Sequence, residues 1–374
     1  YDTCRLLAIN LFGYVQNPFT KEAYFDFELF KKHAAMAQRI MDDIVDLEIE
    51  KVDAILDKII NDPEDEETKR IEKQLWQKIK EKSKQGRRTG IGITAEGDML
   101  AALGLIYGTD EATEFSVEVH KTLATEAYRS SVNMAKDRGS FPVFDYKKEE
   151  NNPFIKRIAT VDPQIVEDMK KYGRRNIALL TIAPTGSVSI CTQTTSGIEP
   201  AYLIAYTRKR KVNPNDASVQ HATRDELGDY WEKYNVFHHN FLLWLEKNGY
   251  NVEEVRHYSK EKLDEVVAKS PYYKATSNDI NWVSKVKMQG AVQKWVDHSI
   301  SVTVNLPNHV TEDLVSEVYE TAWKSGCKGM TIYRDGSRSG VLVNEEENNS
   351  SEKVVRFKET HAPKRPKILD ADVV

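Results

Sequence analysis

A hydroxyl-rich turn at residues 184–189 is the segment of this sequence best suited to bind a ligand. The letters PTGSVS follow the apolar run IALLTIA at 177–183, which has the length of a buried strand. A helix that begins here would offer free backbone N–H groups and its positive dipole end, and Thr185, Ser187 and Ser189 add hydroxyl donors. The turn therefore favours a phosphate group, although an ordinary N-capped helix has the same spacing. It is not a Walker A loop, because G-x-x-x-x-G-K-[ST] is absent.

Other polar segments allow two interpretations each. The turn TTSGIEP at 194–200 carries one carboxylate, Glu199, which could bind a substrate hydroxyl or cap the turn. The basic run RKRK at 208–211 could meet a nucleotide or RNA, but short charge runs are usually solvated. The histidines, including the adjacent pair at 238–239, show no metal-ligand spacing, so we predict no metal site.

Cysteine content and charge limit the classes of protein to consider. The cysteines Cys4, Cys191 and Cys327 form no CxxC pair, and we expect each to be free and reduced. The chain has 374 residues, with 53 Lys and Arg against 58 Asp and Glu, and a net charge of −5 argues against general nucleic-acid binding. No apolar run approaches the roughly 20 residues that cross a bilayer. We therefore expect a cytoplasmic protein that binds neither nucleic acid nor membrane.

The first half of the chain has the pattern of long helices. Apolar residues recur at helical spacing from Leu29 to Ile60, which predicts a long amphipathic helix or two in series. The charged stretch 64–84 predicts a solvated helix, and 111–136 predicts another helix. Glycines punctuate the segment 89–108, which we interpret as a tight turn that leads into a buried helix. The glycine spacing does not match a dinucleotide-binding fingerprint.

The second half has an α/β pattern. The run ISVTVNL at 300–306 predicts a strand, and Thr311 is a suitable N-cap for a helix that ends near Gly326. The letters GMTIY at 329–333 predict a further strand. Strand, helix and strand in this order indicate a βαβ crossover with parallel strands, and ligands of such sheets bind at the carboxyl ends of the strands.

Taken together, these segments resemble the catalytic subunit of ribonucleotide reductase. The similar motifs occur in this order: YDTCRLLAINLFGYV, RRTGIGITAEGDML, DRGSFPVF, IALLTIAPTGSVSI, TTSGIEPAY, YTRKRKV, VQKWVDHSISVTVNLP and AWKSGCKGMTIYRDGSR. The resemblance covers about residues 1–340. It implies an α/β fold: the C-terminal part of a ten-stranded α/β barrel, built from two parallel halves, with long amphipathic helices.

Within this family the chain is most similar to the adenosylcobalamin-dependent class. The class that uses a separate radical-generating subunit has two adjacent tyrosines near the last strand, whereas here Ile332 precedes Tyr333. The resemblance therefore implies adenosylcobalamin as the cofactor. The class with a separate subunit stays open as an alternative, and so does a non-catalytic nucleotide- or phosphate-binding remnant.

The resemblance also implies roles for individual residues. Cys4 matches one of the two cysteines that reduce the ribose and become a disulfide, which a thioredoxin-like or dithiol reductant then restores. Ser196, Gly197 and Glu199 would line the substrate cleft. The substrate diphosphate of the ribonucleotide would bind at Pro184, Thr185, Gly186, Ser187, Val188 and Ser189.

The family's radical cysteine and general-base glutamate lie in an Asn-Pro-Cys-x-Glu segment that this chain does not contain. We therefore expect a C-terminal part of a reductase that needs the N-terminal half of the barrel for activity, with a homodimer as a further possibility. Residues 1–340 are expected to form the barrel part. The Asn-, Glu- and Ser-rich, then basic, stretch 341–374 is expected to be a flexible tail or linker.

Overall fold

The computed structural model describes residues 5–212, 222–224 and 230–337. Internal contacts divide the chain into two units, Tyr1–Asp335 and Gly336–Val374, and the elements described below belong to the first. Cys4 and the predicted tail 341–374 lie outside the described residues. No described helix is long and apolar enough to cross a membrane.

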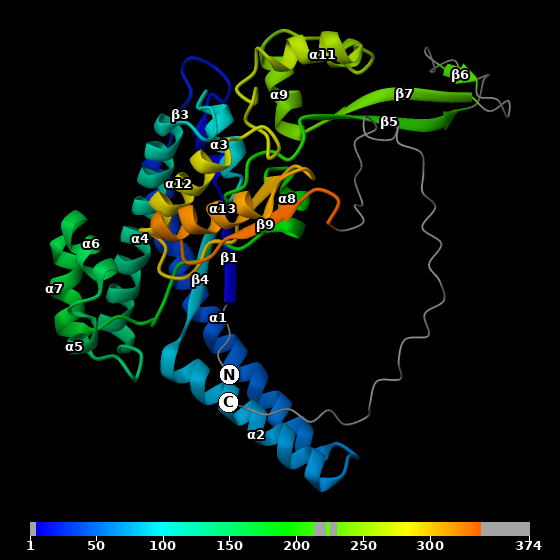
Figure 1. Ribbon diagram of the computed structural model, residues 1–374. Coiled ribbons are helices and arrows are strands. Elements are labelled where there is room, and N and C mark those ends of the chain that lie inside the picture. The colour runs from blue at the N-terminus through cyan, green and yellow to red at the C-terminus, as the bar shows by residue number, and fades with distance from the viewer. Residues whose placement is uncertain (1–4, 213–221, 225–229, 338–374) are drawn as a thin grey trace. The chain divides into compact units, whose positions relative to one another are not determined.

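The chain is helix-rich and contains parallel strands, as the α/β prediction required (Figure 1). The strands and the short 3-10 helix η1 are β1 (Arg5–Asn10), η1 (Leu11–Tyr14), β2 (Val15–Gln16), β3 (Tyr24–Phe25), β4 (Thr89–Thr94), β5 (Ala205–Val212), β6 (Ala222–Arg224), β7 (Tyr230–Phe237), β8 (Thr303–Leu306) and β9 (Thr331–Arg334). The helices are α1 (Phe27–Asn61), α2 (Glu66–Gly86), α3 (Glu96–Ala102), α4 (Asp110–Arg138), α5 (Tyr146–Glu149), α6 (Pro153–Val161), α7 (Pro163–Tyr172), α8 (Gly186–Thr192), α9 (His239–Lys247), α10 (Val252–Val255), α11 (Lys260–Val267), α12 (Trp282–Gln293) and α13 (Glu312–Lys324).

Parallel segments from distant parts of the chain form one continuous layer. β1 pairs in parallel with β4, and the isolated parallel bridges Ile91↔Leu180 and Ile182↔Ile300 continue the layer through the segments 179–183 and 299–306. β8 then pairs in parallel with β9, which confirms the predicted βαβ crossover. The order of these segments corresponds to one parallel half of the expected barrel, and the described residues contain no closed barrel.

The glycine-spaced segment 89–94 forms a strand, so its prediction as a turn was wrong. The letters TGIGIT make up β4, which is buried along its whole length between β1 and the segment 179–183. Glycine is required here for close approach: a Cβ atom on Gly92 would lie 2.0 Å from the carbonyl oxygen of Thr181. The buried helix predicted to follow is present as α3.

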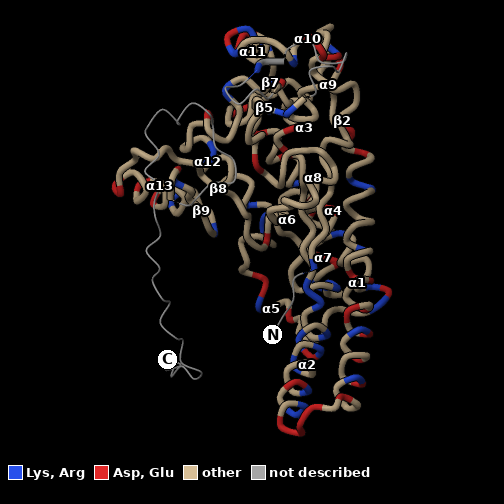
Figure 2. The backbone as a smooth tube through the Cα atoms, turned by 90° about the vertical axis from the view of Figure 1, so that its right-hand side faces the viewer, with Lys and Arg blue, Asp and Glu red and all other residues tan. Residues whose placement is uncertain are grey.

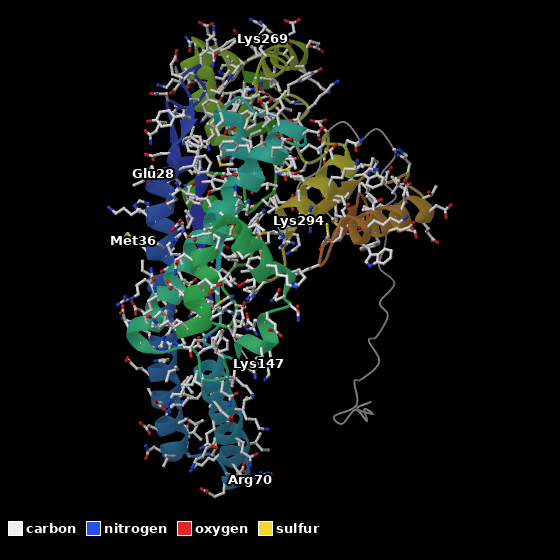
Figure 3. All side chains as sticks on the ribbon, turned by 90° about the vertical axis from the view of Figure 1, so that its left-hand side faces the viewer. Glu28, Met36, Arg70, Lys147, Lys269 and Lys294 are labelled. Carbon is white, nitrogen blue, oxygen red and sulfur yellow. The ribbon has the colours of Figure 1, made fainter. Side chains whose placement is uncertain are left out.

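Long helices pack against this layer, as their apolar periodicity predicted. α1 buries one face, including Phe30, Met41 and Val45, against β1, β4 and α4. α2 packs on α1. Acidic and basic residues recur along α2, which lies in the lower part of Figure 2. Figure 3 shows Glu28 and Met36 on the outer side of α1, and Met36 is half exposed. The antiparallel strands β5, β7 and β6 form a separate ribbon.

Candidate functional site

The hydroxyl-rich turn lies at the carboxyl end of the parallel layer, where β4 and the segment 179–183 end. α8 begins at Gly186, as the sequence predicted, but the Thr185 side chain does not cap it, because Thr185 adopts φ 52°. Instead, Thr185 Oγ1 accepts a hydrogen bond from the Gly197 N–H at 2.7 Å and lies 3.0 Å from Thr94 Oγ1. One hydroxyl therefore connects β4, the start of α8 and the segment 194–200.

The first turn of α8 is accessible to a ligand. Pro184 and residues 186–188 are exposed, whereas Ser189 is buried and donates its hydroxyl to the Gly186 carbonyl at 2.8 Å. The first N–H groups of a helix have no acceptor within the helix, so they are available to an anion. Ser187 adds an exposed hydroxyl beside them. The geometry is therefore suited to a phosphate or diphosphate group.

The segment 194–200 is held tightly beside this turn. Gly197 is buried and adopts φ 50°, and a Cβ atom there would lie 2.9 Å from the Ala183 carbonyl oxygen. Ser196 is half-buried, and its carbonyl accepts the Glu199 N–H at 2.9 Å. The structure thus brings Ser196 and Gly197 next to the hydroxyl-rich turn.

Glu199 points toward β8 and α12. Its Oε1 accepts the Thr303 N–H at 2.7 Å, and its Oε2 lies 2.5 Å from the ammonium group of the buried Lys285. Lys285 also donates to the Thr303 carbonyl. Both carboxylate oxygens are engaged within the protein, and a contact of Glu199 with a substrate hydroxyl stays a prediction.

Asp98 is a buried carboxylate that our interpretation of the sequence missed. Its Oδ1 accepts from His238 Nε2 at 2.7 Å and from the Tyr272 hydroxyl at 2.8 Å. Its Oδ2 accepts from Asn240 Nδ2 and the Thr195 N–H, both at 2.8 Å. The only signal was the pair of acidic residues, Glu96 and Asp98, between the apolar stretches of the segment 89–108. Asp98 therefore connects α3, the segment 194–200 and the start of α9.

A hollow of about 410 Å³ lies at the far end of α8 from the turn. Its lining mixes hydrogen-bonding groups with aromatic and aliphatic surface: Ser189, Ile190, Gln193, Thr194, Tyr206, Phe237, His238 and His239. Because His238 Nε2 contacts Asp98, the buried carboxylate fixes the imidazole at the edge of this hollow.

The described cysteines differ in accessibility. Cys191 is exposed on α8, whereas Cys327 is half-buried, and burial raises the pKa of its thiol to about 11. A thiol with such a pKa is a poor nucleophile at neutral pH. Cys327 packs against Val286 and the end of α13, which indicates a structural role for this side chain.

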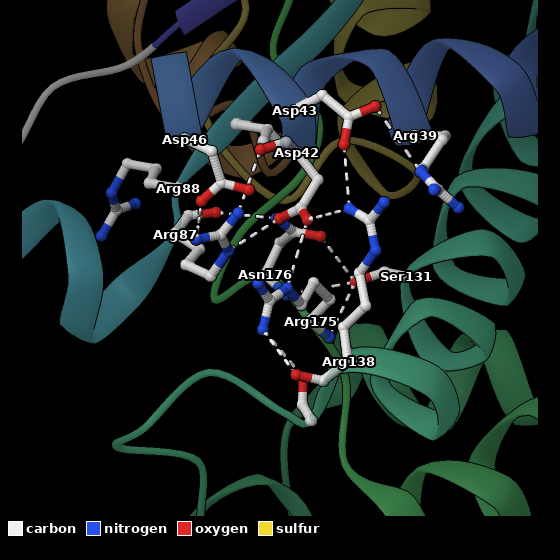
Figure 4. Close-up of polar contacts among 12 residues, drawn as sticks. Arg39, Asp42, Asp43, Asp46, Arg87, Arg88, Ser131, Arg138, Arg175 and Asn176 are labelled. Atoms are coloured by element: carbon white, nitrogen blue, oxygen red, sulfur yellow. Dashed lines mark hydrogen bonds and ion pairs between the residues drawn. The ribbon is translucent and has the colours of Figure 1, made fainter. Parts of the chain in front are cut away.

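A second polar cluster lies at the opposite, amino end of β4 (Figure 4). Oxygen atoms of Asp42, Asp43 and Asp46 lie within 4.8 Å of one another. Arg87 contacts Asp42 at 2.8 Å and Asp46 at 2.7 Å. Arg138 contacts Asp43, and Arg175 contacts Asp42. Burial opposes ionisation of Asp42, but Arg87 and Arg175 outweigh it and lower the pKa of its carboxyl group. These aspartates thus join α1 to the strand layer.

The chain is similar in sequence to known ribonucleotide reductases. The family model described as "Ribonucleotide reductase, barrel domain" matches residues 1–333. A vitamin B12-dependent ribonucleoside-diphosphate reductase of Mycobacterium tuberculosis is 28% identical over 349 residues, which cover 92% of this chain and 41% of the relative. One from Thermoplasma acidophilum is 28% identical over 346 residues, covering 91% of this chain and 36% of the relative. The chain thus spans about two fifths of the length of such curated relatives.

The fold also resembles a solved structure. The Actinobacillus ureae class Id ribonucleotide reductase alpha subunit superposes with a TM-score of 0.55 at 16% identity, covering 89% of this chain and 50% of that chain. At this identity the likeness concerns the fold alone.

Proposed function

Because this chain belongs to the ribonucleotide reductase barrel-domain family, we propose that it is one part of a ribonucleotide reductase, which makes deoxyribonucleotides by thiyl-radical chemistry. The observation that carries the proposal is the exposed first turn of α8 at the carboxyl end of the parallel layer. The part would act together with the N-terminal half of the barrel.

The substrate is a ribonucleoside di- or triphosphate held by its phosphates. The N–H groups of residues 186–188 and the Ser187 hydroxyl bind the diphosphate, and Pro184 shapes the entry to the helix. Thr185 acts mainly by positioning, since its hydroxyl already contacts Gly197 and Thr94. Ser196 and Gly197 line the cleft beside the phosphates, and Glu199 holds this segment against β8.

The proposed cofactor is adenosylcobalamin. The names of the Mycobacterium and Thermoplasma relatives support cobalamin, and Ile332 before Tyr333 supports the class that lacks the tyrosine pair. The hollow at the end of α8 is too small to enclose such a group, but the exposed Ile190 and Gln193 at its edge would offer one apolar and one hydrogen-bonding contact to it. When bound, the cofactor would supply the initiating radical.

The reducing electrons come from thiols. Loss of the 2′-hydroxyl as water takes two electrons, and a thiol pair that closes to a disulfide supplies them. Cys4 is the proposed member of this pair in the present chain, with its partner in the N-terminal half. A thioredoxin-like or dithiol reductant would restore both thiols.

The remaining features of the proposal concern organisation. Residues 1–340 would form the barrel part and 341–374 a flexible linker in a cytoplasmic enzyme that could form a homodimer. A reductase with a separate radical-generating subunit is the alternative, and a Chlamydia pneumoniae relative, named "Ribonucleoside-diphosphate reductase subunit alpha", is 25% identical over 90% of this chain and 30% of the relative.

The decisive experiment is reduction of CDP and CTP by this chain, alone and mixed with an N-terminal segment that ends in the Asn-Pro-Cys-x-Glu loop, with a dithiol and with or without adenosylcobalamin. We expect activity only in the mixture that contains the cofactor. A further mixture replaces adenosylcobalamin with a separate radical-generating subunit, and activity in this mixture alone would favour the alternative class. Inactivity despite association of the two pieces would favour a phosphate-binding remnant.

A further inference from the structure

A buried carboxylate without a hydrogen-bond partner lies directly after β4. Glu96, the first residue of α3, is completely buried and faces Ser116 and His120 of α4. Glu96 Oε2 lies 3.6 Å from His120 Nε2, which is longer than a hydrogen bond. Within the described residues, both Glu96 oxygens, Ser116 Oγ and His120 Nε2 are buried without a hydrogen-bond partner. Such a concentration of unsatisfied polar atoms is unusual in a protein interior.

The tautomer of His120 makes this arrangement unfavourable unless a proton is added. His120 Nδ1 lies 2.8 Å from the Ser116 carbonyl oxygen. A carbonyl only accepts, so Nδ1 carries a hydrogen, and the neutral ring presents a bare Nε2 to Glu96. An ionised Glu96 would then face a second acceptor in a site that is closed to bulk solvent. One proton removes the conflict, either as a carboxylic acid that donates to Nε2 or as an imidazolium that donates to the carboxylate.

The surrounding groups do not supply a different countercharge. Tyr107 donates its hydroxyl to the Ile198 carbonyl at 2.6 Å. Burial is the main cause of the raised pKa of this hydroxyl, and Glu199 and Glu96 raise it further. The Glu199 carboxylate is held by Lys285, and that of Asp98 by the donors described above. Burial raises the pKa of the Glu96 carboxyl, and among the described residues the neighbouring His120 opposes this effect.

The backbone of Glu96 also holds the segment beside the hydroxyl-rich turn. The Ala95 N–H donates to the Thr195 carbonyl at 2.9 Å, and the Glu96 N–H donates to the Gly197 carbonyl at 3.3 Å. Gly97 is packed so closely that an added Cβ would lie 2.9 Å from the Glu199 carbonyl oxygen. A movement of the first turn of α3 would therefore be transmitted to residues 195–199.

We propose that Glu96, Ser116 and His120 form a buried site that binds one proton and that this proton holds residues 195–199 in place. The site is independent of catalysis and goes beyond the proposed function. Loss of the proton leaves a buried anion, which is relieved only when water enters and the first turn of α3 moves. Compared with Glu96→Gln, the native chain therefore binds one more proton on folding, over the pH range between the ordinary and the raised pKa of Glu96.

The test is urea unfolding of the full chain between about pH 5 and about pH 9, for the native protein and for Glu96→Gln. A raised pKa in the folded state gives stability that is complete below the ordinary pKa of 4.5 and is lost as pH rises through the raised value. Within that window we expect the unfolding constant of the native protein, relative to Glu96→Gln, to rise by up to about tenfold per pH unit. The matched control is Glu114→Gln, an exposed glutamate on α4, which should follow the native profile.

Nitrogen NMR of His120 in the native protein tests the site even if a variant folds poorly. We expect Nδ1 to carry hydrogen at every pH and Nε2 to report the shared proton, with the amide of Gly197 shifting at the same midpoint. Parallel unfolding profiles for the native protein and Glu96→Gln would overturn the proposal. A His120 Nε2 that stays unprotonated and free of a hydrogen bond from about pH 5 to about pH 9 would also overturn it.

Discussion

Lys285 and Glu199 form an ion pair that fixes the segment after α8 to the strand layer. The lysine side chain is 3% exposed and that of the glutamate 23% exposed. Thr303 donates its N–H to one carboxylate oxygen and accepts the lysine through its carbonyl. Three elements distant in sequence, the 194–200 segment, α12 and β8, therefore depend on one pair of opposite charges.

Removing one member of this pair should be costly. Lys285→Met leaves the carboxylate without its counterion, and we expect the free energy of unfolding to fall by about 3 kcal/mol. Lys285→Met combined with Glu199→Leu should recover part of this loss, because no buried charge is left. Urea unfolding measures both. The exposed pair Lys324 and Glu320 is the control, and Lys324→Met should cost no more than about 0.5 kcal/mol. Additive effects of the two buried substitutions would contradict this account.

Gly92 cannot accept a side chain. A Cβ atom there would lie 2.0 Å from the backbone oxygen of Thr181, and β4 cannot move away from the segment 179–183 without breaking the layer. We expect Gly92→Ala to lower the free energy of unfolding by about 3 kcal/mol or more. Gly13→Ala is the matched control, because nothing lies within 4 Å of the Cβ position there. Equal thermal stability of the two variants would show that β4 is not packed as described.

The same glycine explains why β4 was missed in the sequence. The Thr and Ile residues of TGIGIT suit a strand, but its two glycines are typical of a turn. Gly92 is nevertheless what the close approach to Thr181 demands. The long helices were predictable because α1 repeats apolar residues at helical spacing over its whole length. The crossover from β8 through α13 to β9 was predictable from its short connections.

The pairs at the candidate site were not predictable in this way. Lys285 and Glu199 are 86 residues apart, and Asp98 and His238 are 140 residues apart. No local period links such positions, so a single sequence shows only isolated charges. The turn at 184–189 could be identified because its chemistry is local: a strand, a proline, hydroxyls and a helix start.

Substitutions in the hydroxyl-rich turn should separate binding from folding. In the reassembled reductase, Ser187→Ala should raise KM about tenfold with kcat retained, because one hydrogen bond to a charged phosphate is lost. Thr185→Val should raise KM and also lower the free energy of unfolding by about 1 to 3 kcal/mol, since the Gly197 N–H loses its acceptor. Unchanged KM for both variants would remove this turn from the substrate site.

Cys4 should be essential for turnover and dispensable for binding. Cys4→Ser keeps the size of the side chain but cannot form a disulfide, so the two electrons for ribose reduction are not delivered. We expect reduction of CDP or CTP to stop in the reassembled reductase while nucleotide binding, measured by calorimetry, is retained. Normal turnover by Cys4→Ser with a thioredoxin-like reductant would remove the assignment.

The thiols of Cys191 and Cys327 should react at very different rates. Burial raises the pKa of Cys327 to about 11, so only about one thousandth of it is thiolate near pH 8. Cys191 is exposed and should be alkylated by iodoacetamide first. Peptide mass spectrometry of the folded chain should show slow labelling of Cys327, which accelerates about tenfold per pH unit until the raised pKa is reached. In urea the two rates should converge, because burial no longer disfavours the thiolate. Equal rates in the folded chain would mean that the packing of Cys327 against Val286 and α13 is open to solvent.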